Sequence, residues 1–385
     1  MKIVYVIDSL GSKGGAERIL SDKMNYLATH FNNNVFVITC YQNPLITPNV
    51  YYLSDQVKQI NLNISYYSQY KYKYPKRLWV KYSIHRELCR QLKNTIFEIK
   101  PDILIGLSYF MGDFVSSIKC NASKIIESHE ARIFTLSDNG LNRSWLSKIY
   151  MKFYRWAYFR TIETNADVVV TLTQGDAIEW KKARRVEVIP NFTTMRPNTQ
   201  TYNIESKRVI SVGRLEWQKG YDTLIEIWKV VSKKHPEWEL AIFGEGTLKD
   251  KLTSLIKTAK LTNIHINPFT SNISDEYSKS SIFVLSSRFE GFSLVLLEAL
   301  QHGLPCVAFD CPFGPSDIIE DNKLGYIVKC NDLQTFSEKI CALIESVELR
   351  KEFSASAKGR ASAYNIDTIM LSWEQLFESQ KQDLQ

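Results

Sequence analysis

Two glutamates that stand eight positions apart are the most specific chemical signal in this sequence. Glu290 begins the run Glu-Gly-Phe-Ser, and Glu298 lies among leucines in the apolar segment that follows. Gly303 and Pro305 come soon after this segment and mark the end of a helix. Glu290 thus precedes the predicted helix and Glu298 lies within it. We expect the two carboxylates to contact different parts of one elongated ligand rather than to share one proton.

The carboxylate of Glu298 needs hydrogen-bond donors, because burial in so apolar a helix would otherwise favour its protonated form. The hydroxyl groups of a ligand could be these donors. The alternative is a partly exposed glutamate that pairs with a nearby Arg or Lys. The residue alone leaves both interpretations open.

Two cations follow the strand that we predict at Arg208–Val212. Arg214 and Lys219 lie in the turn that leads from this strand into a helix, and ligands of parallel α/β domains bind at the carboxyl ends of strands. Arginine presents a planar fork to phosphate oxygens and lysine a compact charge, so the two could hold a diphosphate while it leaves. The alternative is a pair of solvated loop cations.

A glycine-rich loop follows the first predicted strand, Lys2–Ile7. Gly14 and Gly15 open a helix there, so backbone N–H groups and the positive end of the helix dipole can bind an anion. The loop does not match the G-x-G-x-x-G pattern of dinucleotide-binding folds. A tight turn that needs glycine for its geometry alone is an equally good interpretation.

Short apolar runs that alternate with helical patterns indicate the fold. The predicted strands lie at Lys2–Ile7, Val35–Ile38, Ile103–Ile105, Lys124–Ile126, Val168–Val170, Arg208–Val212, Leu240–Phe243, Ile264–Ile266, Ile282–Leu285, Cys306–Phe309 and Gly325–Val328. Repeated βα units predict doubly wound parallel sheets in an α/β protein. We therefore expect one domain at residues 1–190, a linker at 191–206, a second domain at 207–365, and a helix at 366–385 that packs back on a domain.

The composition is that of a soluble globular protein, with 385 residues of which 44% are apolar and 23% charged. No apolar stretch approaches the roughly 20 residues that cross a bilayer, which argues against a signal peptide or a membrane span. The seven cysteines are scattered, without a C-x-x-C pair or metal-ligand spacing. We expect them to be reduced thiols in a cytoplasmic chain.

The net positive charge comes from the first half of the chain. Residues 1–200 contain 27 Lys and Arg against 16 Asp and Glu, a net +11, whereas residues 201–385 contain 21 against 25, a net −4. This asymmetry indicates that one half binds something anionic. The segment 145–160 combines four cations with many aromatic residues, and 70–81 adds five cations, a composition typical of a helix in an anionic membrane interface. The alternative is an aromatic helix that faces the core, with solvated lysines.

Three of these elements together resemble the retaining glycosyltransferases of family 4. They are the Glu-x7-Glu element of residues 290–298, the Gly-Arg-x4-Lys-Gly element of residues 213–220 and the Gly-Gly-Ala-Glu-Arg run of residues 14–18. The resemblance implies two Rossmann-like domains that face each other in the GT-B arrangement. It also implies a nucleotide-sugar donor bound mainly by the C-terminal domain and an acceptor bound mainly by the N-terminal domain.

The resemblance further implies roles for individual residues. Glu298 would hold the ribose hydroxyls and Glu290 the donor sugar, while Arg214 and Lys219 would bind the diphosphate. His129 resembles the histidine near the donor sugar in this family, and with Glu290, Arg214 and Lys219 it completes the predicted catalytic set. A structural histidine at a strand end fits the residue nearly as well. The following residues would bring backbone N–H groups to the sugar and phosphates: Gly14, Gly15, Gly291, Phe292 and Ser293.

The sequence contains no D-x-D pair, with which other glycosyltransferases hold a divalent ion on the diphosphate. We therefore predict neither a metal nor another cofactor. The charge of the leaving group would be met by Arg214, Lys219 and the N-termini of helices.

The predicted function is transfer of a hexosyl or N-acetylhexosaminyl group from UDP to a glycan, such as a lipid-linked saccharide of bacterial capsule or lipopolysaccharide assembly. The predicted location is the cytoplasm, peripheral on the inner face of the cell membrane. One alternative is a nucleotide-sugar epimerase of similar architecture, which needs no acceptor. Another is a non-catalytic protein that docks on membrane or RNA. The lack of an arginine-rich strip or a recognisable RNA-binding module argues against nucleic acid as a partner.

Overall fold

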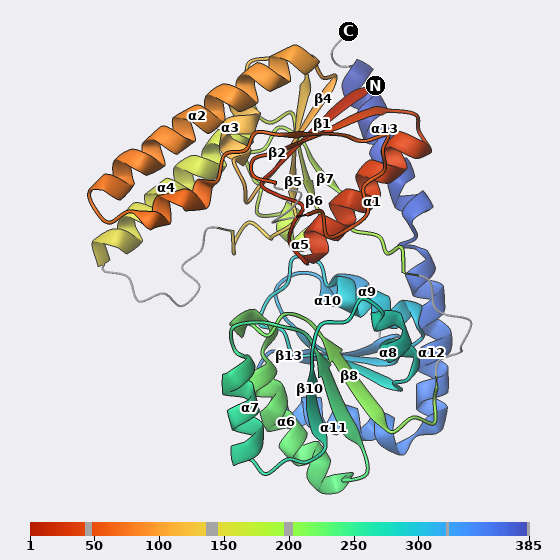
Figure 1. Cartoon of the computed structure of the whole chain (residues 1–385). Helices are drawn as coiled ribbons and strands as arrows, with labels where there is room; N and C mark the ends of the chain where they lie inside the picture. Colours follow the sequence, from red (N-terminus) through yellow and green to blue (C-terminus); the bar gives the residue numbers. More distant parts are fainter. Residues whose placement is uncertain (43–47, 136–144, 196–202, 321–322, 383–385) are drawn as a thin grey trace. The chain divides into compact units, whose positions relative to one another are not determined.

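The computed structural model describes residues 1–42, 48–135, 145–195, 203–320 and 323–382. These residues form two compact units (Figure 1). Unit 1 contains residues 1–190 and 369–385, and unit 2 contains residues 191–368. Residues 196–202 of the predicted linker lie outside the described part of the chain.

Unit 1 is built on a parallel sheet of seven strands in the order β3-β2-β1-β4-β5-β6-β7. The strands are β1 (Lys2–Ile7), β2 (Asn34–Thr39), β3 (Lys58–Asn61), β4 (Ile103–Leu107), β5 (Ser123–Ser128), β6 (Val168–Thr171) and β7 (Val186–Val188). The predicted doubly wound parallel sheet is confirmed. The prediction missed β3 and β7, because the sequences Lys-Gln-Ile-Asn and Val-Glu-Val are too short and too polar to form an apolar run.

The helices of unit 1 connect these strands, because parallel neighbours need crossover connections. They are α1 (Gly15–Thr29), the 3₁₀ helix η1 (Tyr66–Lys71), α2 (Lys76–Ile99), α3 (Gly112–Ser117), α4 (Trp145–Asn165) and α5 (Gln174–Ala177). The C-terminal helix α13 (Ile366–Gln382) joins this unit from residue 369 onward. Its Trp373 and Phe377 are buried, which accounts for the apolar face of the helix.

Unit 2 contains a parallel sheet of six strands in the order β10-β9-β8-β11-β12-β13. The strands are β8 (Arg208–Val212), β9 (Glu239–Phe243), β10 (Ile264–Asn267), β11 (Ile282–Leu285), β12 (Cys306–Asp310) and β13 (Gly325–Lys329). Each predicted strand of this half agrees with an observed strand to within one residue at either end. Both faces of β9, β11 and β12 are largely buried, so their sequences are nearly continuous apolar runs, whereas the edge strands β10 and β13 are partly exposed.

The helices of unit 2 are the 3₁₀ helix η2 (Trp217–Lys219), α6 (Tyr221–Lys234), α7 (Lys249–Thr258), α8 (Ile273–Ser278), α9 (Leu294–Gln301), α10 (Pro315–Ile318), α11 (Leu333–Glu345) and α12 (Val347–Ser362). α6 packs against α11, and α9 packs against α12. The core between α6, α11 and the sheet includes Trp228 and Phe336, which have no exposed surface.

Each sheet reverses its strand order at one point, between β1 and β4 in unit 1 and between β8 and β11 in unit 2. Loops that leave such neighbouring strands run in opposite directions and open a crevice at the carboxyl ends, where α/β domains bind ligands. The glycine-rich loop follows β1, and the loops at 213–220 and 286–293 follow β8 and β11. The topology therefore places two of the predicted site segments at one switch point of unit 2.

Candidate functional site

Hydrogen bonds join the loops that follow β8 and β11. The Ser286 hydroxyl donates to the Lys219 carbonyl oxygen at 2.9 Å, and the Arg288 backbone N–H donates to the Gln218 carbonyl oxygen at 2.7 Å. Gly220 lies at this junction with a φ of +63°, and a Cβ there would collide with the Ser286 carbonyl oxygen. The glycine of the Gly-Arg-x4-Lys-Gly element is therefore required by backbone geometry and by the close approach of the two loops.

Lys219 and Glu290 form the charged centre of these joined loops. The Lys219 ammonium lies 2.7 Å from Glu290 Oε1, and the two side chains are 13% and 6% exposed. The Ser287 hydroxyl donates to the same oxygen at 2.5 Å. A buried carboxylate needs such partners, because it loses its hydration when it is buried. From the sequence, Lys219 was expected to bind the diphosphate and Glu290 the donor sugar. In the structure the two side chains form a pair.

Arg214 is exposed at the carboxyl end of β8. Its Nη2 donates to Gln218 Oε1 at 3.2 Å. Arg288 is held differently, because its Nη2 lies 2.9 Å from Asp222 Oδ2 and its guanidinium lies 4.9 Å from the centroid of the Trp217 ring. Arg214 therefore presents its charge at the surface of the crevice, whereas Arg288 stabilises the loop.

Glu298 is buried in α9, with 5% of its surface exposed. Its Oε2 accepts a hydrogen bond of 3.1 Å from the hydroxyl of Tyr277, a fully buried residue of α8. The ring of Tyr277 also lies 5.1 Å from that of His302. The alternative of a partly exposed Glu298 is therefore wrong, and a tyrosine contributes one of the donors that the carboxylate needs. Tyr277 could not be predicted as this donor, because no local sequence pattern connects it with Glu298.

The segment 291–293 lies between Glu290 and α9. Phe292 is 7% exposed, and its ring lies 5.8 Å from that of Tyr364. Gly314 approaches from the loop after β12 with a φ of +101°, and a Cβ there would lie 3.2 Å from the Ser293 nitrogen. The Ser293 hydroxyl is buried without a hydrogen-bond partner. Such hydroxyls are rare, and this one lies at the N-terminus of α9, where an anion is electrostatically favoured.

The glycine loop of unit 1 is closed by a side chain of its own helix. Gly14 is the N-cap of α1 and Gly15 its first residue. The Ser12 hydroxyl donates to Glu17 Oε1 at 2.9 Å, and a Cβ on Gly14 would collide with Glu17 Oε2. Glu17 therefore supplies the negative charge that the helix dipole favours here. Burial, and also Glu17, raises the pKa of Asp8, so an external anion would meet two carboxyl groups at this loop.

His129 follows β5, and its ring is buried within unit 1. Its Nε2 lies 2.8 Å from Glu127 Oε2, and the side chain is 3% exposed. The same oxygen accepts a hydrogen bond of 2.5 Å from the ammonium of Lys23 on α1, and the Lys23 and Glu127 side chains are 1% and 2% exposed. The Lys23 nitrogen also lies 3.8 Å from the centroid of the Trp373 ring, a cation–π contact. We refer to these three polar residues as the Lys23–Glu127–His129 network.

Opposing effects act on the Glu127 carboxyl. Burial alone would raise its pKa, but the Lys23 ammonium and the hydrogen bond with His129 hold the pKa below its usual value. Burial lowers the pKa of Lys23, while the Glu127 carboxylate acts in the opposite direction. Glu127 is therefore an anion in the folded protein.

The sequence analysis missed both Lys23 and Glu127, although one signal for Lys23 was present. The residue lies on the apolar face of α1, next to Leu20, Met24 and Leu27, which are all buried. A lysine on a buried face needs an anionic partner. The partner of Lys23 could not be identified from the sequence, because Glu127 stands 104 positions away.

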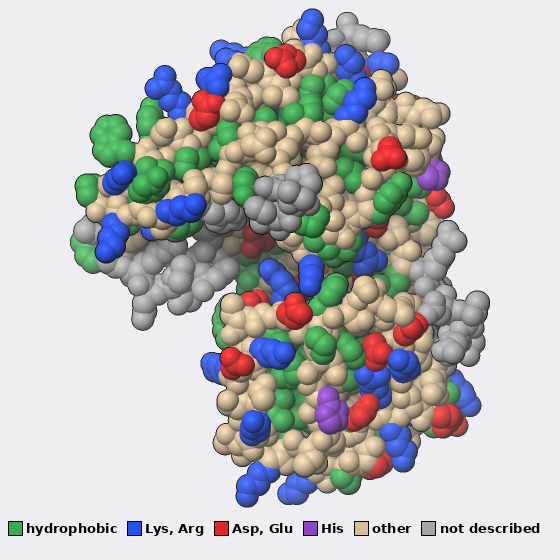
Figure 2. All heavy atoms as spheres, in the orientation of Figure 1, with side chains coloured by type: hydrophobic (Ala, Val, Ile, Leu, Met, Phe, Trp, Pro, Cys, Tyr) green, Lys and Arg blue, Asp and Glu red, His purple; other side chains and the backbone are tan. Residues whose placement is uncertain are grey.

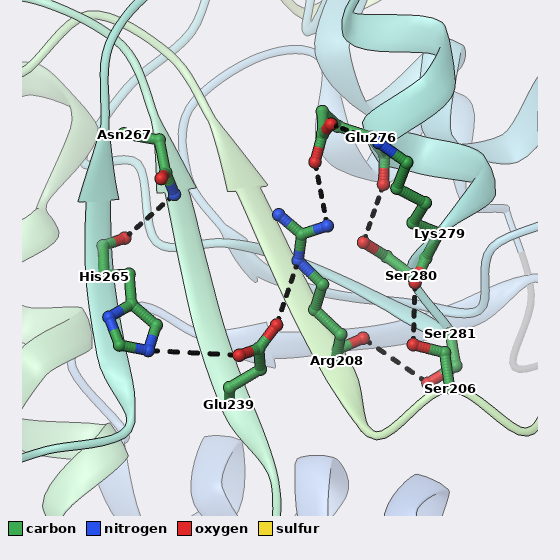
Figure 3. A network of polar contacts seen from close by, with 9 residues as sticks. All are labelled: Ser206, Arg208, Glu239, His265, Asn267, Glu276, Lys279, Ser280 and Ser281. Atoms are coloured by element: carbon green, nitrogen blue, oxygen red, sulfur yellow. Dashed lines mark hydrogen bonds and ion pairs between the residues drawn. The ribbon is translucent and has the colours of Figure 1, made fainter.

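A polar pocket of about 510 Å³ lies at the other end of the unit 2 sheet, near the amino ends of β8, β9 and β10. Arg208 pairs there with Glu239 at 3.3 Å and with Glu276 at 2.8 Å, and His265 lies 3.9 Å from Glu239 (Figure 3). These charges are balanced among themselves. Ligands of parallel α/β sheets bind at the carboxyl ends, so this pocket is not part of the candidate site.

No group of three or more His, Cys, Asp or Glu side chains is placed to hold a metal ion in the described part of the chain. No helix within the described segments has the length and hydropathy that crossing a membrane requires.

The comparisons with known proteins agree over both units. Residues 196–360 match the family described as glycosyl transferases group 1. The chain is 28% identical to an uncharacterized glycosyltransferase of Haemophilus influenzae and to the amylovoran biosynthesis glycosyltransferase AmsD of Erwinia amylovora, and each alignment covers 97% of this chain and 99% of the relative. The fold is similar to that of a TarM variant of S. aureus solved with fondaparinux, alpha-GlcNAc-glycerol and UDP. That similarity has a TM-score of 0.77 at 18% identity and covers 98% of this chain and 99% of TarM.

We expect that replacing Glu127 alone destabilises unit 1. Glu127→Gln leaves the Lys23 ammonium buried without a counter-charge, which lowers the free energy of unfolding by about 3–5 kcal/mol. Lys23→Met/Glu127→Gln removes both charges, so the double variant recovers most of that loss. Urea unfolding of the wild type and both variants measures the difference. Equal destabilisation of the single and double variants would contradict a buried ion pair.

Proposed function

We propose that this chain, a glycosyltransferase of the GT-B fold whose C-terminal part matches the group 1 family, transfers a hexosyl or N-acetylhexosaminyl group from UDP to a saccharide of a bacterial surface polysaccharide. The transfer retains the anomeric configuration and needs no metal ion. A relative named for amylovoran biosynthesis supports the acceptor class, and the UDP in the TarM structure supports the donor.

The observation that carries this proposal is the Lys219–Glu290 pair at the switch point of unit 2. Both side chains are largely buried, yet they lie in loops at the carboxyl ends of β8 and β11. Burial of a charged pair in such a loop costs hydration free energy. A site that must meet growing negative charge on a leaving group gains from cations fixed in advance, because no reorganisation is then needed during the reaction.

The donor would extend along unit 2 from α9 to the loop after β8. Glu298, held by the Tyr277 hydroxyl, would accept hydrogen bonds from the ribose. Arg214 and Lys219 would bind the diphosphate, and Glu290 would contact the sugar while it orients Lys219. The backbone N–H groups of Gly291, Phe292 and Ser293 would approach the phosphates, where the Ser293 hydroxyl would gain the partner that it lacks.

Gly14 and Gly15 have a different role in this proposal from the one that the sequence indicated. Because Glu17 already meets the N-terminus of α1, a phosphate would be repelled there. The hydroxyl groups of a sugar, which donate hydrogen bonds to carboxylates, suit this loop better. We therefore assign the loop to the acceptor or to the donor sugar rather than to the diphosphate.

Unit 1 also exposes many aromatic side chains on η1, α2 and α4. On these elements and in the turn between η1 and α2, the aromatic side chains more than one third exposed include Tyr70, Tyr72, Tyr74, Trp79, Tyr82, Trp145, Tyr150, Phe153, Tyr154 and Trp156, and the apolar Leu78 and Ile149 are exposed beside them. Exposed lysines of the same segments include Lys71, Lys73, Lys76, Lys81, Lys148 and Lys152. Figure 2 shows apolar and basic side chains together over α2 and α4. We refer to these residues as the aromatic basic surface.

The core-facing alternative for α4 holds only for the C-terminal half of the helix, where Tyr158 and Phe159 are buried. Exposed apolar patches of this extent mark interaction sites. Aromatic rings and lysines together suit the interface of a membrane that contains anionic lipids. We therefore propose that the protein binds peripherally to the cytoplasmic leaflet, where a lipid-linked saccharide acceptor would be within reach.

Within this proposal, the first prediction concerns Glu290. A panel of UDP-sugars, tested first for thermal stabilisation and then with a lipid-linked acceptor, identifies the donor. Glu290→Gln should lower the transfer rate about 100-fold or more, because the group that orients Lys219 and contacts the sugar is lost. Glu276→Gln is the matched control, since Glu276 is paired with Arg208 at the opposite end of the same sheet. Full activity of Glu290→Gln would exclude this assignment, and turnover without acceptor would indicate an epimerase.

A second prediction concerns the charge of the leaving diphosphate. We expect EDTA to leave the transfer rate unchanged. Arg214→Gln should raise the KM for the donor about tenfold or more, since a hydrogen bond to a charged group contributes about 1.5–3 kcal/mol. Steady-state kinetics with and without EDTA measure both effects. Activity that disappears in EDTA and returns with magnesium would refute metal-independent transfer.

A third prediction concerns the aromatic basic surface. We expect the protein to float with vesicles that contain phosphatidylglycerol and not with pure phosphatidylcholine vesicles. Reversal of Lys71, Lys73, Lys76 and Lys81 to Glu should abolish flotation, because each lysine contributes about 1 kcal/mol near an anionic surface. The control reverses the four exposed lysines Lys249, Lys251, Lys257 and Lys260 of unit 2. Equal loss in both variants, or no preference for anionic lipid, would contradict a specific membrane surface.

A further inference from the structure

The Lys23–Glu127–His129 network contains two atoms that ion pairing does not explain. His129 Nδ1 and Glu127 Oε1 are both buried without a hydrogen-bond partner. The His129 ring is therefore held through Nε2 alone, at 2.8 Å from Glu127. A buried polar atom without a hydrogen-bond partner lowers the stability of the folded protein. Because Nδ1 has no partner, the hydrogen bond of Nε2 is the one polar contact that orients this ring.

The network also fixes the tautomer of His129. An ionised carboxylate only accepts hydrogen bonds, and Glu127 Oε2 accepts one from the Lys23 ammonium. The second contact of the same oxygen, with His129 Nε2, therefore requires a proton on Nε2. In the neutral ring Nδ1 then has no proton and lies buried inside unit 1.

The part of His129 that a ligand can reach is its main chain. The residue as a whole is partly exposed, whereas its side chain is only 3% exposed. Neighbouring contacts hold the same loop, since the Ser128 hydroxyl donates to Asp176 at 2.7 Å and the Thr135 hydroxyl donates to the Glu130 carbonyl oxygen at 2.9 Å. The backbone after β5 is thus held in place by hydrogen bonds of side chains within unit 1.

We infer that the His129 ring anchors this loop and is not a general acid or base, and that Lys23 and Glu127 are positioning residues that hold the ring. Their task is to keep the main chain of residues 128–130 in place at the carboxyl end of β5. This inference rests on the proposed function, because a loop at the carboxyl ends of the unit 1 strands would bind a substrate of the transferase. A displacement of about 1 Å at such a contact can lower a rate about 100-fold.

The first experiment compares two substitutions of the ring. His129→Gln places an amide N–H where Nε2–H was and can still donate to Glu127, whereas His129→Met has similar bulk and no donor. We expect His129→Gln to retain at least about a tenth of the wild-type kcat/KM and His129→Met to lose about 100-fold. A general acid or base contributes about 100- to 10,000-fold, so a loss of that size in both variants would overturn the inference.

The second experiment changes the other end of the network at constant charge. Lys23→Met/Glu127→Gln keeps an acceptor for His129, and Lys23→Met/Glu127→Met removes it. We expect the first double variant to be at least about tenfold more active than the second, because only the first holds the ring. Glu163→Gln is a control in the same unit, since Glu163 pairs with Arg132 at 2.7 Å and does not belong to the network. Equal kcat/KM in the two double variants would overturn the inference.

A spectroscopic readout separates this inference from the proposed function. ¹⁵N-histidine NMR, assigned with His129→Gln, should find the Nε2–H tautomer in the wild type and in Lys23→Met/Glu127→Gln, and a tautomer mixture in Lys23→Met/Glu127→Met. A wild type that transfers no sugar would refute the proposed function, yet the tautomer would still test the network. A wild type with the Nδ1–H tautomer would refute the network whatever the activity.

Discussion

A charge inside a protein must be matched by a partner of opposite sign, and this constraint decides which residues meet at the carboxyl ends of both sheets. In unit 2 it brings Lys219 to Glu290 and so joins the loops after β8 and β11. In unit 1 it brings Lys23 to Glu127 and so joins α1 to the end of β5. Both pairs are complete without a ligand. The groups that would act on a substrate are therefore positioned before it arrives, which is the condition for electrostatic catalysis.

The strands were predictable from the sequence wherever both faces of the sheet are buried. A strand such as β11, with four buried residues, is apolar throughout, and its short length between turn signals distinguishes it from a buried helix. The edge strands β3 and β7 are only partly buried, so polar residues are tolerated and the pattern is lost. The predicted doubly wound sheets did not specify a strand order. The structure shows where the order reverses, between β1 and β4 and between β8 and β11.

The partners within the candidate site were not predictable. A motif fixes residue types along the chain, but Lys219 and Glu290 stand 71 positions apart, and Tyr277 and Glu298 stand 21 apart. Whether two such side chains meet depends on how their loops cross in the folded protein. The spacing of the residues along the sequence does not determine this. The position of His129 at the end of a strand was apparent from the sequence. The burial of its ring against Glu127 was not, because it depends on Lys23, which comes from α1. Glu17 shows the same limit at short range, because its carboxylate occupies the place that the glycine loop suggested for a phosphate.

The two units share a topology but present opposite charge at their switch points. The crevice of unit 2 contains Arg214, Lys219 and the N-terminus of α9. In unit 1, Tyr109 follows β4; burial raises the pKa of its hydroxyl, and the negative charges of Glu17, Glu127, Asp8 and Glu130 raise it further. The net charges of the two halves, +11 for residues 1–200 and −4 for residues 201–385, have the reverse sign. The exposed lysines of the aromatic basic surface contribute part of the positive charge of the first half. In the proposed function a diphosphate binds to the half with net negative charge. This is possible because the field at a site depends on the few charges that face it rather than on their sum over the domain.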